Sequence, residues 1–161
     1  MNNNDILRRV RYALDISNPA MIQIFQLSGC SLELPTLLKL LKKEEEEEFI
    51  SCSNPLLSFF LDGLIIHKRG RRESDDGQAP KPDAGLNNNA ILKKLRIALD
   101  LKEEDMLAVM HLAGVVLSKS ELSALFRNKG HKHFKECGDQ FLRNFLQGLT
   151  IKFRGANPGQ Q

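Results

Sequence analysis

The residues that could act as a nucleophile or bind a metal ion gather in one short stretch of the second half of the chain. His131, His133 and Cys137 form the pattern H-x-H-x-x-x-C. A cysteine near a helix N-terminus can have a lowered thiol pKa, and a nearby imidazole could serve as its base. The same three side chains could hold Zn²⁺, which prefers nitrogen and sulfur ligands.

Neither chemistry is complete in the sequence. A nucleophile needs a positioned base and an oxyanion site, and the corresponding stretch before Cys52 holds Glu46 and Glu48 in place of histidines. The zinc pattern lacks an evident fourth ligand, because only Glu136 or Asp139 stands nearby. We therefore predict no catalytic residue, no metal site and no cofactor, and we expect the cysteines to be small buried apolar groups.

A second candidate functional feature is a difference in charge between two stretches that lie 85 residues apart. Glu44–Glu48 reads E-E-E-E-E, whereas Lys129–His133 reads K-G-H-K-H. Five basic residues are the candidate binding residues of this second stretch and its surroundings: Lys119, Arg127, Lys129, Lys132 and Lys135. Three interpretations stay open: two solvated loops, two loops that attract each other within or between chains, or a basic loop that binds phosphate.

The two stretches correspond because the chain is a tandem duplication. Residues 2–70 align with residues 87–155 without a gap, with 25 identities in 69 positions. The first copy has a net charge of −1 and the second a net charge of +5, in a chain of net charge +3. We assign residues 1–70 to repeat 1, 71–86 to a flexible polar linker, 87–155 to repeat 2 and 156–161 to a disordered tail.

Hydrophobic spacing predicts an all-α protein in which each repeat contains about four helices. In repeat 1 we expect a first helix over roughly 5–16 with Asn4 as its N-cap, and a second over roughly 19–28 with Asn18 as its N-cap. Gly29 would end the second helix in the left-handed conformation. In repeat 2, Ser118 and Glu121 form a capping box at the start of the third helix.

The fourth helix of each repeat is the most apolar segment, and it contains a glycine. It is expected to begin near residues 53–55 and 138–139, and its apolar character places it at the centre of its bundle. Gly63 and Gly148 suggest a close crossing with another helix; the alternative is that each glycine ends the helix and a short strand follows. Arg11 and Asp15 are spaced as a surface ion pair, and Arg69 could reach Asp15 to close the bundle.

The duplicated motifs resemble those of the YehS-like family of uncharacterised bacterial proteins. They are N-x-x-I-L-x-x-x-R-x-A-L near the start of each copy, F-L-x-G-L in the fourth helix and the final R-G. The resemblance covers residues 2–70 and 87–155. It implies a small bacterial cytoplasmic protein with a duplicated domain of unknown function, and it assigns no catalytic residue, cofactor or partner.

Composition narrows the class of protein further. Hydrophobic residues make up 42% and charged residues 27% of the chain, which excludes a disordered or collagen-like chain. No apolar run reaches the roughly 18 residues that a membrane helix needs, and three cysteines in one chain suit a reducing cytoplasm. We expect a non-catalytic binding or adaptor protein whose partner is another protein or a second copy of the chain. The alternative is a nucleic-acid-binding protein that uses the basic loop of repeat 2.

Overall fold

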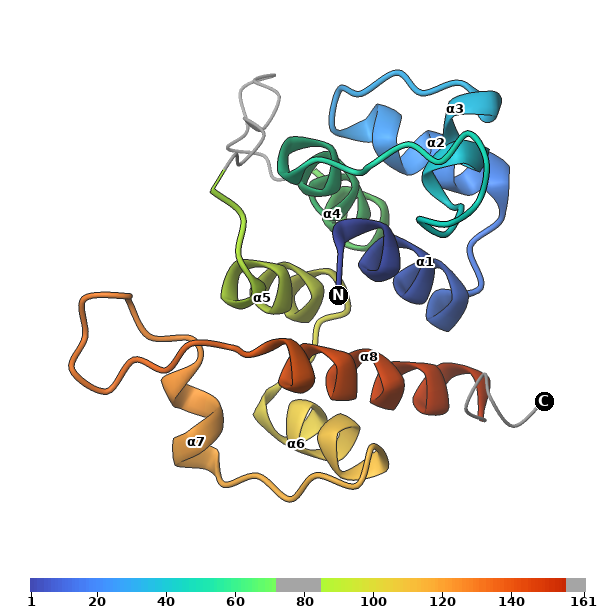
Figure 1. The fold of residues 1–161 in the computed structure, drawn as a ribbon. Coiled ribbons are helices and arrows are strands. Elements are labelled where there is room, and N and C mark those ends of the chain that lie inside the picture. Colours follow the sequence, from blue (N-terminus) through green and yellow to red (C-terminus); the bar gives the residue numbers. More distant parts are fainter. Residues whose placement is uncertain (72–84, 156–161) are drawn as a thin grey trace. The chain divides into compact units, whose positions relative to one another are not determined.

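The computed structural model describes residues 1–71 and 85–155, which belong to two compact units, Met1–Leu86 and Asn87–Gln161 (Figure 1). In the described residues every regular element is a helix, which confirms the all-α class and the duplicated architecture. Repeat 1 contains α1 (Asn3–Leu14), α2 (Asn18–Leu27), α3 (Leu34–Leu40) and α4 (Asn54–Arg69). Repeat 2 contains α5 (Asn88–Ala98), α6 (Glu103–Leu112), α7 (Lys119–Ala124) and α8 (Asp139–Arg154). Most of the predicted linker, 72–84, and the predicted tail, 156–161, lie outside the described residues.

Helices start at residues that favour a helix N-terminus, either through a capping side chain or through the fixed backbone angle of proline. Ser53 accepts a hydrogen bond from the Leu56 amide at 3.2 Å, and Pro55 occupies the first turn of α4. The predicted capping box at α7 is confirmed, because Ser118 and Glu121 exchange hydrogen bonds. Each helix of repeat 2 begins 85 residues after its counterpart in repeat 1.

Two predicted N-caps are wrong. The cap of α1 is Asn2, whose side chain accepts from the Asp5 amide at 2.8 Å, while Asn4 is buried inside the repeat. The cap of α2 is Ser17, and Asn18 is instead the first residue of the helix. In both cases the neighbouring polar residue has the extended backbone that a cap requires, a difference that side-chain type alone does not reveal.

The core of each repeat forms where the second and fourth helices pack together. Helix α2 packs on α4, and α6 packs on α8. In repeat 1 the rings of Phe25 and Phe60 lie 5.5 Å apart with their planes tilted by 46°. Both rings are fully buried, as is Phe145 in repeat 2. The central place that the sequence assigned to the fourth helix is therefore confirmed.

Both fourth helices run unbroken through their glycines to Arg69 and Arg154, so the strand alternative is wrong. The predicted close crossing is confirmed. A Cβ atom at Gly63 would overlap the carbonyl oxygen of Ile24 and lie 2.8 Å from its carbonyl carbon. A Cβ atom at Gly148 would meet Val109, the equivalent residue of α6, in the same way, 2.9 Å from its carbonyl carbon. Only glycine lets these backbones approach so closely.

Left-handed residues end the first two helices of each repeat. Gly29 has φ 98° and Gly114 has φ 82°, and the Cys30 amide donates back to the Phe25 carbonyl at 3.0 Å, as in a Schellman motif. Asp15 follows α1 with φ 52° and so lies outside the helix. Arg11 donates to the Asn18 side chain at 2.7 Å, a contact that the sequence did not predict.

We predict that Gly63→Ala and Gly148→Ala each lower the free energy of unfolding by about 1–3 kcal/mol, because the added methyl group overlaps a backbone carbonyl. Urea denaturation measures the change. Gly130→Ala is the matched control, because a Cβ atom there meets nothing within 4 Å. Alanine is the better helix former by about 1 kcal/mol, so a gain in stability at position 63 or 148 would contradict the close crossing.

Candidate functional site

An asparagine on the first helix of each repeat, buried in repeat 1 (Asn4) and half-buried in repeat 2 (Asn89), holds the loop that follows the third helix. The Asn4 amide group donates to the carbonyls of Leu40 and Ile50, at 2.8 Å each, and its oxygen accepts from the Cys52 amide at 2.9 Å. Leu40 ends α3, and Cys52 stands just before α4. One side chain thus fixes both ends of the loop that joins these helices.

Repeat 2 reproduces the arrangement bond for bond. Asn89 donates to Leu125 at 3.0 Å and to Lys135 at 2.9 Å, and it accepts from the Cys137 amide at 2.9 Å. The preceding asparagine adds a bond in both repeats, since Asn3 and Asn88 donate to the carbonyls of Cys52 and Cys137 at 3.0 and 3.1 Å. We call these four residues, Asn3, Asn4, Asn88 and Asn89, the asparagine clamp.

The clamp and the cap together account for the duplicated N-N-N motif. The first asparagine caps the helix, the second holds the backbone before the fourth helix, and the third holds both ends of the loop. The third position needs a side chain that both donates two hydrogen bonds and accepts one, which a carboxamide does and a carboxylate does not. This role was not predicted from the sequence, although the repetition of all three asparagines was a usable signal.

Cys52 and Cys137 are buried, as predicted, and burial makes them poor nucleophiles, whereas the prediction is wrong for Cys30, which is only half-buried. Cys52 is 4% exposed and Cys137 is 5% exposed. Burial raises the pKa of the Cys52 thiol to about 12, and burial together with the negative charge of Asp139 raises the pKa of Cys137 to about 11. At neutral pH both groups are neutral thiols, which is the opposite of a thiol activated for catalysis.

The histidines do not join Cys137 in a metal site. Both imidazoles are exposed, with ring centres 5.6 Å apart, and the His131 Nδ1 atom accepts from the His133 amide at 3.0 Å. In residues 1–71 and 85–155 no group of three histidine, cysteine or acidic side chains is placed to hold a metal ion. The same described residues contain no helix with the length and apolarity needed to cross a bilayer.

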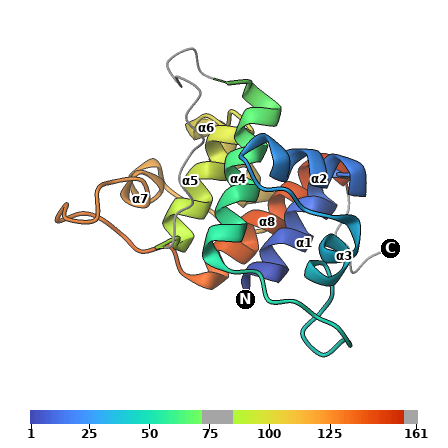
Figure 2. The ribbon, with the colours of Figure 1, turned by 90° about the horizontal axis from the view of Figure 1, so that it is seen from above.

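The structure brings the five predicted binding residues onto one helix–loop segment. We call them the basic surface: Lys119, Arg127, Lys129, Lys132 and Lys135. The four lysines are exposed, and the half-buried Arg127 donates to the His133 carbonyl at 3.2 Å. The Lys135 amide donates to the Ala124 carbonyl at 3.0 Å, which holds the end of the loop against α7. Figure 2 shows this loop extending away from the helices of its repeat.

The equivalent loop of repeat 1 presents carboxylates. We call Glu44–Glu48 the acidic loop, and all five of its residues are exposed. The Lys42 ammonium group bridges the loop by donating to the Glu47 carbonyl at 2.7 Å, and Arg8 on α1 donates to the Lys42 carbonyl at 2.7 Å. Both loops are therefore held by backbone contacts while most of their charged side chains remain in solvent.

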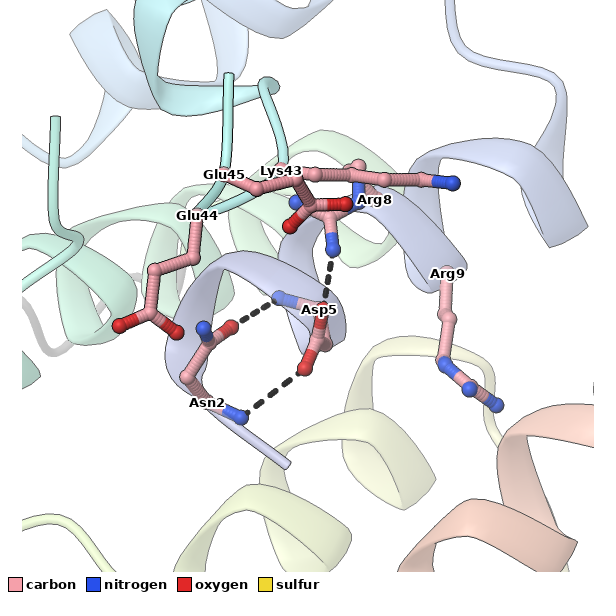
Figure 3. A pocket seen from close by; sticks show the side chains of 7 residues that line it. All are labelled: Asn2, Asp5, Arg8, Arg9, Lys43, Glu44 and Glu45. Atoms are coloured by element: carbon pink, nitrogen blue, oxygen red, sulfur yellow. Dashed lines mark hydrogen bonds and ion pairs between the residues drawn. The ribbon is translucent and has the colours of Figure 1, made fainter. Parts of the chain in front are cut away.

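A hollow of about 400 Å³ lies where the acidic loop passes the first turn of α1 (Figure 3). Its lining residues carry both signs of charge: Asn2, Asp5, Arg8, Arg9, Lys43, Glu44 and Glu45. Asp5 accepts from the Asn2 amide at 3.1 Å and forms an ion pair with Arg8. Repeat 2 has a hollow of about 300 Å³ at the corresponding place, beside Asn87 and Lys129. The hollow of repeat 1 is polar, whereas Phe134 and Cys137 also line the hollow of repeat 2.

Comparisons with known proteins agree with the duplication. The model of a family described as a protein of unknown function, DUF1456, matches residues 3–70 and again residues 88–155. The chain is 45% identical over 152 residues to the uncharacterised protein YehS of Escherichia coli strain K12, covering 94% of this chain and 96% of that protein. No solved structure matches. The two matched ranges contain the whole of α1–α4 and the whole of α5–α8.

We predict that Asn4→Ala lowers the free energy of unfolding by about 2–4 kcal/mol, because three hydrogen bonds are lost and buried backbone groups remain unpaired. The loop should also loosen, so iodoacetamide should modify Cys52 faster in the native protein, as followed by peptide mass spectrometry. Asn2→Ala is the control: it removes only a cap, costs about 1 kcal/mol and should leave Cys52 protected. Equal labelling of Cys52 in both variants would contradict the clamp.

Proposed function

Because the chain belongs, in duplicate, to the DUF1456 family, whose function is unknown, we propose from its structure that it is a non-catalytic binding protein of the bacterial cytoplasm. The observation that carries this proposal is the asparagine clamp. In both repeats it fixes the ends of one loop on a packed helical scaffold, while the side chains at the loop tip stay exposed. Surface loops positioned by a rigid scaffold are a common way to build recognition sites.

The pattern of change between the repeats supports the same proposal. Several residues that build the scaffold are identical in both copies, including the clamp asparagines, the crossing glycines and the buried cysteines. The loop tips instead differ in charge, with five glutamates in one and lysines and histidines in the other. One scaffold thus presents two different surfaces. The neutral, buried thiols give no support to an enzymatic alternative.

We predict that a photo-crosslinking amino acid placed at Glu46 or Lys132 captures a defined partner from a bacterial lysate. The same amino acid at Gln23 or Ala108 is the control, because these are equivalent exposed positions on α2 and α6, away from the loops. A partner captured from the loops and not from the helices supports the proposal. Capture that is equal at all four positions, or absent from both loops, would contradict it.

A second candidate function is binding to nucleic acid, and the gathering of the basic surface on one segment favours it. Lys119, at the start of α7, and the loop lysines are exposed, so they could contact phosphates without reorganisation of the core. The α6–α7 pair does not resemble a helix-turn-helix that reads DNA bases. Helix α7 has only 6 residues, and the connection from α6, residues 113–118, is long. Binding would therefore be electrostatic and indifferent to sequence.

For this second function we predict salt-dependent binding to labelled duplex DNA or single-stranded RNA, measured by fluorescence anisotropy. The triple variant Lys129→Glu, Lys132→Glu, Lys135→Glu should lose at least about tenfold in affinity, since phosphate contacts dominate such binding. A control carries the same charge change at exposed lysines elsewhere in repeat 2: Lys93, Lys102 and Lys152. No binding even at low salt, or equal losses in both variants, would rule out the basic surface as a nucleic-acid site.

A further inference from the structure

Repeat 1 leaves an apolar helix face uncovered beside its acidic loop. Leu34 and Leu38 on α3 are each 46% exposed, and Ile50, at the end of the loop, is 37% exposed. The two leucines are four residues apart, so they lie on one face of the helix. The Ile50 amide donates to the Lys39 carbonyl at 3.3 Å, which holds the backbone at Ile50 against α3, at the residue that follows Leu38. Large apolar side chains grouped in this way on a surface mark an interaction site.

The equivalent face of repeat 2 has the opposite character. Lys119 takes the place of Leu34, Ser123 the place of Leu38 and Lys135 the place of Ile50. Two members of the basic surface thus occupy positions that are apolar in repeat 1. The helices of the two repeats begin in the same sequence register. The three substitutions therefore change the side chains at equivalent positions of one surface.

We propose that the α3 face of repeat 1, with its acidic loop, binds the basic surface of repeat 2 from a second copy of this chain. This inference rests on the proposed binding function and names the partner. One surface carries five glutamates and the other carries five basic residues, so the charges are complementary. The apolar residues can pack against the aliphatic stems of the lysines, which cover apolar surface while their charged ends stay in water.

Repeat 2 also has exposed apolar residues a few positions before Lys119 in the sequence. Val116 is 86% exposed, two residues before the Ser118 cap of α7, and Leu112 at the end of α6 is 45% exposed. Repeat 1 has serine, Ser31, where repeat 2 has Val116. Each repeat therefore exposes large apolar side chains as well as charged ones. Since every chain carries both surfaces, two chains can pair reciprocally and make the same contact twice.

Two variants test the proposal by changing one surface each. The first, with Leu34→Lys, Leu38→Ser and Ile50→Lys, replaces the apolar face of repeat 1 with the residues that repeat 2 carries at the same positions. The second, with Lys129→Glu and Lys132→Glu, gives repeat 2 the glutamates that repeat 1 carries there. All five positions are exposed, and circular dichroism and urea denaturation check that the fold is kept.

Sedimentation velocity at protein concentrations up to about 200 µM, a range that detects weak contacts, should show that the wild-type chain self-associates. The association should weaken at least about tenfold between about 0.02 M and 0.5 M salt, because the contact is largely charged. Each variant alone should be impaired. An equimolar mixture should associate more strongly than either variant alone and stop at a pair, because only one of the two contacts is intact.

A monomeric wild-type chain at every concentration and salt would overturn the inference, as would variants that associate like the wild type or a mixture that gains nothing. These outcomes are distinguishable from failure of the proposed function. A chain that stays monomeric but still crosslinks another protein through its loops keeps that function with a different partner. A wild-type chain that stays monomeric but binds nucleic acid through the basic surface assigns that surface to phosphate instead.

Discussion

The fold of each repeat depends on one asparagine carboxamide that holds a loop at both ends, and in repeat 1 this carboxamide is buried. Asn4 is 1% exposed, yet it is surrounded by the backbone polar groups of Leu40, Ile50 and Cys52, which no helix satisfies. A buried polar group without a partner costs about 1–3 kcal/mol. Three such groups would therefore strongly destabilise a repeat of this size. The side chain pairs all three, and it thereby sets the distance between the end of α3 and the start of α4.

Much of the fold could be predicted from sequence because its signals are local. The apolar spacing, the Ser118–Glu121 capping box and the helix-ending Gly29 each depend on residues within a few positions of one another. The crossing at Gly63 was also predictable, since a glycine that recurs inside an apolar helix of both repeats is typical of a close backbone approach. The function of Asn4 was not, because an asparagine near a helix start is typical of an N-cap, and only tertiary structure shows its distant partners.

The candidate surfaces were predictable in part, for the same physical reason. The basic residues are close enough in sequence that their gathering on one segment follows from the loop. The exposure of Leu34 and Leu38 was not predicted, because leucines at helical spacing normally indicate a buried core. Helix α3 is only 7 residues long and buries just Leu37 and Leu40, which leaves the other two leucines in solvent. Exposure of this kind depends on packing and is invisible to periodicity.

The two repeats thus share the clamp and the helix crossing but differ in the surfaces beside the clamped loops. That surface is acidic and apolar in repeat 1 and basic in repeat 2. Amide hydrogen exchange followed by NMR tests the clamp most directly. The Cys52 and Cys137 amides, which donate to the clamp asparagines, should exchange at least about tenfold more slowly than the exposed Glu45 and Lys132 amides at the loop tips. Clamp amides that exchange as fast as the tips would contradict an anchored loop and, with it, the basis of the proposed binding surfaces.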